Sequence, residues 1–124
     1  MAGLRLDGAG QAKMTTLDEA VVIHQRLHSL VENYALCVKN NKPSGGIMQN
    51  IKRQFPLLAG KLKGQFGMIA DQVSGMILAT GRGGGDQTKV RALREYIAQI
   101  RQALEITANK VKEQHAVPVE VSPD

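Results

Sequence analysis

The sequence has few of the residues that build covalent, metal or stacking sites. Cys37 is the only cysteine among 124 residues, so neither an internal disulfide nor a cysteine zinc cluster can form within one chain. Tryptophan is absent and aromatic residues make up only 3% of the chain. Proteins that hold single-stranded nucleic acid stack bases on aromatic rings, so this composition disfavours binding by stacking.

Long apolar runs are also missing. No segment approaches the roughly 20 apolar residues that a membrane-spanning helix needs, and the first residues lack the apolar core of a signal peptide. We therefore expect a cytoplasmic protein that does not enter a membrane. A length of 124 residues suits one domain.

Acidic residues are missing from the centre of the chain. None occurs between Glu32 and Asp71, whereas six basic residues do. The net charge of +5 and the pI near 9.6 favour an anionic partner such as RNA or DNA, held mainly through its phosphates. The predicted nucleic-acid-binding residues are Lys52, Arg53, Lys61, Lys63, Arg82, Lys89, Arg91 and Arg94.

Apolar residues recur every three or four positions over most of the chain, which indicates helices. The pattern predicts a first helix from Thr16 to about Lys39 and a last helix from Asp86 to about His115. A third helical pattern lies between them. We predict an all-α fold, an antiparallel helical bundle of three long or four helices.

The residues outside these patterns have no helical period. Residues 1–14 contain three glycines and are predicted to be a flexible arm. Residues 15–115 form the predicted single helical-bundle domain. Residues 116–124 contain two prolines and alternating valines, and are predicted to be a disordered tail.

The central pattern, over residues 46–80, is open to two interpretations. Pro56 removes one helical hydrogen bond, and the glycines between residues 60 and 67 each cost about 1 kcal/mol relative to alanine in a helix. These residues favour two short helices, broken around 56–67. The apolar stripe, however, stays in phase across the same region. On pattern alone we prefer one kinked helix.

The first helix carries two parallel rows of apolar positions. A stripe this wide either lies deep in a bundle or also faces another subunit. We predict a homo-oligomer whose interface uses the second row, formed by Val21, His24, His28, Val31 and Val38. The same face supports a rival function, in which the protein is a scaffold that binds a protein partner without nucleic acid.

Catalytic and metal-binding patterns are weak. His24, His28 and Glu32 have a spacing that presents three metal ligands from one helix, but the sequence indicates no fourth ligand. Residues 81–86 are rich in glycine, yet they follow a helix and no Lys-Ser or Lys-Thr pair completes a phosphate loop. Because there is no catalytic constellation, we predict a non-enzymatic protein without a cofactor or metal.

After the glycine-rich turn, the sequence Tyr96-Ile97-Ala98-Gln99-Ile100-Arg101 with Leu104 resembles the last helix of a bacterial four-helix-bundle family. This family includes the accessory variability proteins of diversity-generating retroelements and proteins encoded within ribosomal-RNA intervening sequences. The resemblance implies a four-helix bundle that assembles into a ring-like pentamer. It also implies contact with nucleic acid or a reverse transcriptase through a basic surface. The leading prediction is therefore binding of nucleic acid or a ribonucleoprotein.

Overall fold

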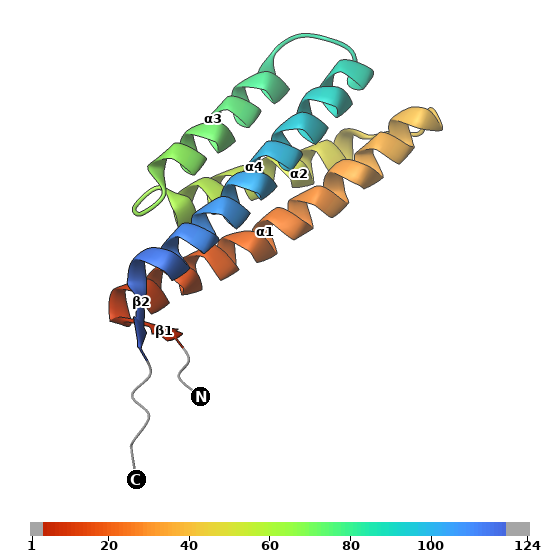
Figure 1. The fold of residues 1–124 in the computed structure, drawn as a ribbon. Helices are drawn as coiled ribbons and strands as arrows, with labels where there is room; N and C mark the ends of the chain where they lie inside the picture. Colours follow the sequence, from red (N-terminus) through yellow and green to blue (C-terminus); the bar gives the residue numbers. More distant parts are fainter. Residues whose placement is uncertain (1–3, 119–124) are drawn as a thin grey trace.

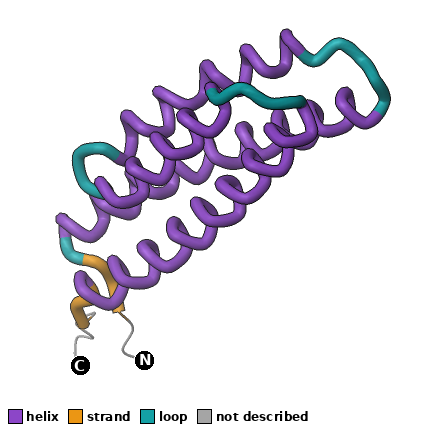
Figure 2. The backbone as a smooth tube through the Cα atoms, turned by 90° about the horizontal axis from the view of Figure 1, so that it is seen from above, coloured by secondary structure: helices purple, strands orange, loops and turns teal. Residues whose placement is uncertain are grey.

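Four helices run alternately up and down the molecule (Figures 1 and 2), which confirms the predicted all-α antiparallel bundle. The structure, a computed structural model, describes residues 4–118. Its elements in chain order are β1 (Leu4–Leu6), α1 (Gly8–Lys39), α2 (Gly45–Leu62), α3 (Gly67–Gly81), α4 (Asp86–His115) and β2 (Ala116–Pro118).

Each helix packs against two others. Helix α1 contacts α2 and α4, and α3 contacts the same two helices. Helices α2 and α4 therefore lie diagonally across the bundle, so their outward surfaces face different sides of the molecule.

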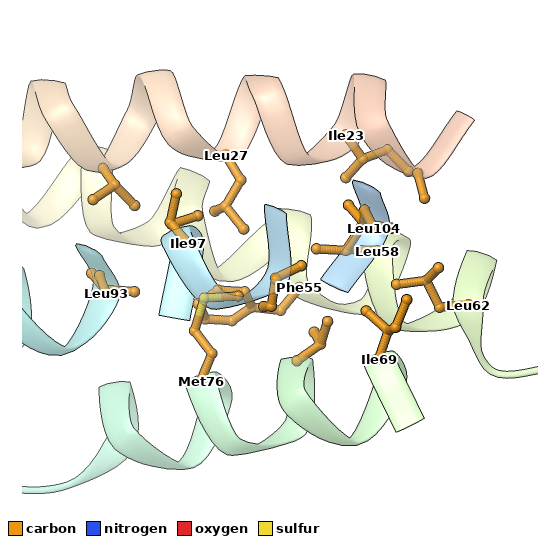
Figure 3. Close-up of a cluster of buried hydrophobic side chains, with 14 of the residues drawn as sticks. Ile23, Leu27, Phe55, Leu58, Leu62, Ile69, Met76, Leu93, Ile97 and Leu104 are labelled. Carbon is orange, nitrogen blue, oxygen red and sulfur yellow. The ribbon is translucent and has the colours of Figure 1, made fainter. Parts of the chain in front are cut away.

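The core lies where the apolar stripes of the four helices meet. In Figure 3, Leu27 of α1, Leu58 of α2, Met76 of α3 and Ile97 of α4 all point into this shared interior. The predicted stripe of the central segment is buried at eight positions, which are Ile51, Phe55, Leu58, Leu62, Ile69, Val73, Met76 and Thr80. The spacing of apolar residues at every third or fourth position therefore identifies the residues that fill the core.

The central segment is two helices, so the preferred single kinked helix is wrong. Helix α2 ends at Leu62, and a turn in which the Phe66 N–H donates to the Leu62 carbonyl (2.7 Å) leads into α3. Gly64 and Gly67 disfavour a continuous helix here. Antiparallel packing then lets both halves bury their stripes in one core. Pro56 lies within α2 and does not end it.

The first helix begins eight residues earlier than predicted, at Gly8 rather than Thr16. Asp7 is its N-cap residue, because the Asp7 Oδ1 accepts a hydrogen bond from the Gly10 N–H (2.7 Å). This hydrogen bond lowers the pKa of the Asp7 carboxyl below its usual range. Thr16, the predicted first residue, lies inside the helix, and the predicted end near Lys39 is confirmed.

A small antiparallel ribbon joins the two ends of the described chain. Strand β1 pairs with β2, with Leu6 opposite Ala116. The predicted flexible arm is therefore wrong for residues 4–14, and the predicted disordered tail is wrong for residues 116–118. The remaining parts of those two predictions, residues 1–3 and 119–124, lie outside the described residues.

Helices α1 and α4 have 32 and 30 residues, against 18 in α2 and 15 in α3. Their ends continue beyond the short helices toward the ribbon (Figure 1). Gly10 is buried there, and a Cβ at this position would overlap the Cβ of His115. The two long helices can therefore approach closely only because residue 10 is glycine.

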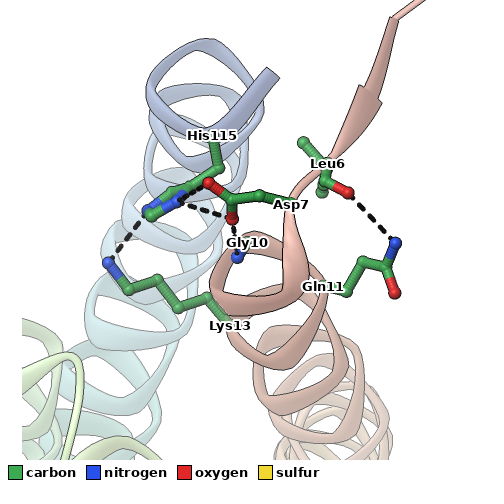
Figure 4. Close-up of polar contacts among 6 residues, drawn as sticks. All are labelled: Leu6, Asp7, Gly10, Gln11, Lys13 and His115. Carbon is green, nitrogen blue, oxygen red and sulfur yellow. Dashed lines mark hydrogen bonds and ion pairs between the residues drawn. The ribbon is translucent and has the colours of Figure 1, made fainter. Parts of the chain in front are cut away.

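A chain of polar contacts closes this end of the α1–α4 pair (Figure 4). Lys13 Nζ lies 3.1 Å from His115 Nε2, and an ammonium group can only donate. The His115 Nε2 therefore accepts, and its Nδ1 donates to the Asp7 carboxylate at 3.1 Å. One carboxylate thus caps α1 and also holds the last residue of α4.

Candidate nucleic-acid interface

The exposed side of α2 carries cations and no carboxylate. Lys52, Arg53 and Lys61 are exposed on the helix, and Lys63 is the exposed residue that caps its C-terminal end. No acidic residue occurs anywhere in α2. At 1.5 Å per residue, the four cations extend over roughly 16 Å along the helix axis. At roughly 100° of rotation per residue, Lys52 and Lys61 lie on opposite flanks of the helix. The four cations therefore surround the outward half of α2, and we call this surface the α2 basic face.

The packing of α2 explains why these cations point outward. Ile51, Phe55, Leu58 and Leu62 occupy the opposite side of the helix and are buried in the core. Gly60 lies exposed among the cations, with open space where a side chain would stand. A polymer backbone can therefore approach this part of α2 closely.

Two members of the α2 basic face already have partners. Lys61 pairs with Glu19 of α1, and the Arg53 Nη1 donates to the Asn50 Oδ1 at 3.2 Å. Both members of the Lys61 pair are about half exposed, and such pairs contribute only about 0–1 kcal/mol. Among residues 4–118, no carboxylate pairs with Lys52. The face is therefore free to exchange its weak contacts for phosphates.

The other four predicted residues lie elsewhere. Arg82 belongs to the connection between α3 and α4, and Lys89, Arg91 and Arg94 lie in the first half of α4. Because α4 is diagonal to α2, the eight predicted residues do not form one surface. The α4 group is also mixed in charge, since Arg94 donates to the two oxygens of Glu32 at 3.0 and 3.4 Å.

Part of the second row of α1 is buried within the monomer. His24 is 3% exposed and Val31 is fully buried, while Val21 and Val38 are half-buried against the core. His24 and Val31 cannot form the predicted subunit interface, because α4 covers this side of α1. At these two positions the wide stripe lies deep in its own bundle, whereas Val21, His28 and Val38 keep part of their surface exposed.

His24 serves the packing of α1 on α4. Its Nε2 lies 2.9 Å from the Ile97 carbonyl, so Nε2 carries the proton and donates. Burial lowers the pKa of His24 below its usual range, and the Ile97 contact opposes this only in part. Among residues 4–118, no three His, Cys, Asp or Glu side chains lie close enough together to hold a metal ion.

Sequence reasoning missed a groove between the C-terminal part of α1 and the N-terminal part of α4. The groove has a volume of about 800 Å³. Its walls are formed by Ala35, Leu36, Val38, Lys39, Asn41, Gln87, Val90, Arg91, Arg94 and Glu95. These two runs are about 50 positions apart in the sequence, so no local pattern could have indicated the groove.

A partly buried hydrogen bond joins the two helices beside this groove. The Tyr34 hydroxyl donates to the Asp86 Oδ1 at 2.7 Å, and Tyr34 is 1% exposed. Burial raises the pKa of Tyr34 far above its usual value. Helix α4 begins at Asp86, as predicted, and its N-cap residue is Gly85. The Asp86 carboxylate anchors α4 to α1.

Comparison of the chain with protein-family models, with curated proteins and with solved structures finds no match. The resemblance of the last helix to the bacterial four-helix-bundle family therefore stays a prediction. Within residues 4–118, none of the helices combines the length and the apolar character that crossing a membrane requires.

Proposed function

We propose that this protein is a non-enzymatic helical bundle that binds RNA or DNA through the α2 basic face. One observation carries the proposal: four exposed cations line a helix that has no acidic residue. Cations arranged in this way neutralise phosphates and release the counterions that surround nucleic acid. The α4 cations are not part of the proposed surface, because they face another side of the bundle.

The chemistry of the α2 basic face favours phosphate contacts over base contacts. The one aromatic residue of α2, Phe55, is 3% exposed and lies in the core, so it cannot stack on a base. Phosphate contacts position a protein but carry no sequence information. The proposed binding is therefore strongly salt-dependent and only weakly sequence-selective.

The alternative function, a scaffold that docks partners on the second row of α1, has less support. Two of the five residues of that row, His24 and Val31, are buried inside the monomer. The proposal keeps the expectation of a cytoplasmic homo-oligomer, which is a pentamer if the family resemblance holds. The mass of the assembly, measured in the binding buffer, tests that part separately.

A salt series tests the proposed function. Fluorescence anisotropy measures binding to a labelled DNA duplex and to a labelled RNA hairpin, between about 50 and 200 mM salt. Four phosphate contacts predict a slope of log affinity on log salt of about −3.6 for duplex DNA. Failure to bind either probe at the lowest salt would reject the proposal.

A matched pair of variants tests the location. The double variant Lys52→Gln/Arg53→Gln removes two charges from the α2 basic face and is expected to flatten the DNA slope by about 1.8. The control Lys110→Gln/Lys112→Gln removes two exposed charges from the far end of α4 and is expected to leave the slope unchanged. An equal effect of both pairs would show that net charge, and not α2, governs binding.

A further inference from the structure

The groove between α1 and α4 is a second surface, separate from the α2 basic face. Its apolar floor is formed by Ala35, Val38 and Val90, which are half-buried, and Leu36 stands on its rim with 55% of its surface exposed. An exposed leucine beside an apolar floor forms a patch that a partner can cover. The wall residues of α4 run from Gln87 to Glu95, which is roughly 12 Å or two helical turns.

Three cations and one carboxylate line the same groove. Lys39 lies on the α1 side, and Arg91, Arg94 and Glu95 lie on the α4 side. Glu32 holds Arg94 through Nε and Nη2. This contact fixes the guanidinium at the wall and leaves three of its five N–H groups unused. The groove is therefore apolar at its floor and mainly cationic along its walls.

This combination suits a peptide better than a nucleic acid. A phosphate backbone gains nothing from the apolar floor. A base has nothing to stack on, because no aromatic residue lines the groove. The walls are two antiparallel helices, and a third helix can place side chains spaced at i, i+4 and i+7 between them.

We propose that this groove binds an acidic amphipathic helix of a partner protein. Apolar side chains of the partner pack on Ala35, Val38 and Val90, and Leu36 covers them from the rim. Carboxylates on the flanks of the partner helix meet Lys39, Arg91 and the unused donors of Arg94. This interaction goes beyond the proposed nucleic-acid binding, because it uses another side of the bundle and another class of ligand.

Synthetic helical peptides test the proposal. The probe is a side-chain-stapled peptide of three turns, with leucines at i, i+4 and i+7 and glutamates beside them. Two matched peptides replace every glutamate with lysine or every leucine with serine. We expect the acidic leucine peptide to bind the full chain at least tenfold more tightly than either control. Equal binding of the acidic and the basic peptide would overturn the proposal.

Protein variants locate the binding. Leu36→Asp and Arg91→Glu are each expected to weaken the acidic peptide at least tenfold. Val22→Asp is the matched control, since Val22 lies on the same helix with 54% exposure but does not line the groove. It is expected to leave peptide affinity unchanged. Equal losses in Leu36→Asp and Val22→Asp would overturn the proposal.

Two further measurements separate this proposal from the nucleic-acid function. The variant Lys52→Gln/Arg53→Gln is expected to keep its peptide affinity while it loses DNA affinity, and loss of both would place the peptide on α2. The RNA hairpin is expected not to displace the peptide. Displacement that disappears in Arg91→Glu would show that the groove is a nucleic-acid site instead.

Discussion

The long helix pair α1–α4 and the short hairpin α2–α3 are held together by different means. Polar side chains cross between the long helices along much of their length. From the ribbon end to the opposite end, these contacts are His115–Asp7, His24–Ile97, Arg94–Glu32 and Tyr34–Asp86. Each contact has a specific geometry, so together they define how α1 and α4 are aligned.

The hairpin has no such contacts. Among the described residues, no side-chain hydrogen bond or ion pair joins α2 to α3. Helix α3 has a single ionisable residue, Asp71. The side-chain carbonyls of Gln54 in α2 and Gln72 in α3 are buried without a hydrogen-bond partner. Apolar packing therefore aligns α2 with α3, and the exposed pair Lys61–Glu19 joins the hairpin to α1.

This difference shows why the two proposed surfaces are unlike. The outward side of α2 takes little part in holding the bundle together, so its cations are available for a ligand. The groove of the long pair lies directly beside the contacts Arg94–Glu32 and Tyr34–Asp86, and its shape depends on them. An exposed, weakly paired set of cations and a shaped groove suit different kinds of partner.

The largest expected effect comes from breaking the packing of the hairpin. Leu58 of α2 is fully buried, and Leu58→Ala is expected to lower the free energy of unfolding by about 2–5 kcal/mol. Leu57 is the matched control, because it is the preceding residue and is 50% exposed. Leu57→Ala is expected to change stability by about 0.5 kcal/mol or less. Urea unfolding followed by circular dichroism measures both, and equal losses would contradict the packing account.

The hairpin also shows how far the sequence predicts the fold. The stripe from Ile51 to Thr80 correctly gives the buried residues. It could not reveal the break between α2 and α3, because the stripe keeps its phase in either arrangement. Tertiary packing decides whether this segment forms one helix or two. Two half-length helices leave the ends of α1 and α4 uncovered, and those ends are buried against each other. The contact of Gly10 with His115, far apart in sequence, has no local signature.

The candidate site was only partly predictable for the same reason. A run without acidic residues is visible in the sequence, and the α2 basic face follows from it once the apolar side of α2 is known. Whether Arg91 joins that face depends on which helices are diagonal, and this is a property of topology. The prediction of a subunit interface is wrong for His24 and Val31, because a wide stripe has the same pattern whether α4 or another chain covers it.

Glycine substitutions distinguish close approach from open surface, with effects of opposite sign. Gly10→Ala is expected to destabilise the protein by about 1–3 kcal/mol, because the new methyl group forces α1 away from His115. Gly60→Ala, on the outward side of α2, meets nothing within 4 Å and is expected to stabilise the protein by about 0.5–1 kcal/mol. Thermal unfolding of the two variants measures both. A stabilising Gly10→Ala would show that the long helices do not need this close contact.

The contact of His24 with α4 predicts a dependence of stability on pH. Because burial holds the pKa of His24 below its usual value of about 6.5, the unfolded chain binds a proton more readily than the native chain. Stability therefore falls as the pH falls below about 6.5, by at most about 1.4 kcal/mol per pH unit. The midpoints of urea unfolding, measured from about pH 7.5 to about pH 5, give this slope.

Two variants isolate the contribution of His24. His24→Gln is expected to reduce the slope, since the proton-binding group is gone. His28→Gln, which replaces a half-buried histidine one turn further along α1, is expected to keep it. An unchanged slope in His24→Gln would assign the acid sensitivity to another group.

The smallest expected effect concerns the ion pair between Arg94 and Glu32. It limits how much this polar contact contributes to the stability of the α1–α4 pair. The two side chains are 55% and 45% exposed, so water and salt screen their attraction. A double-mutant cycle with Arg94→Gln and Glu32→Gln is expected to give a coupling energy of about 0.2–1 kcal/mol that shrinks in high salt. In that case the pair orients Arg94 at the groove wall and adds little to folding.

A coupling above about 2 kcal/mol that resists salt would instead make this pair a main support of the α1–α4 contact. The groove could then not lose Arg94 without the long helices separating.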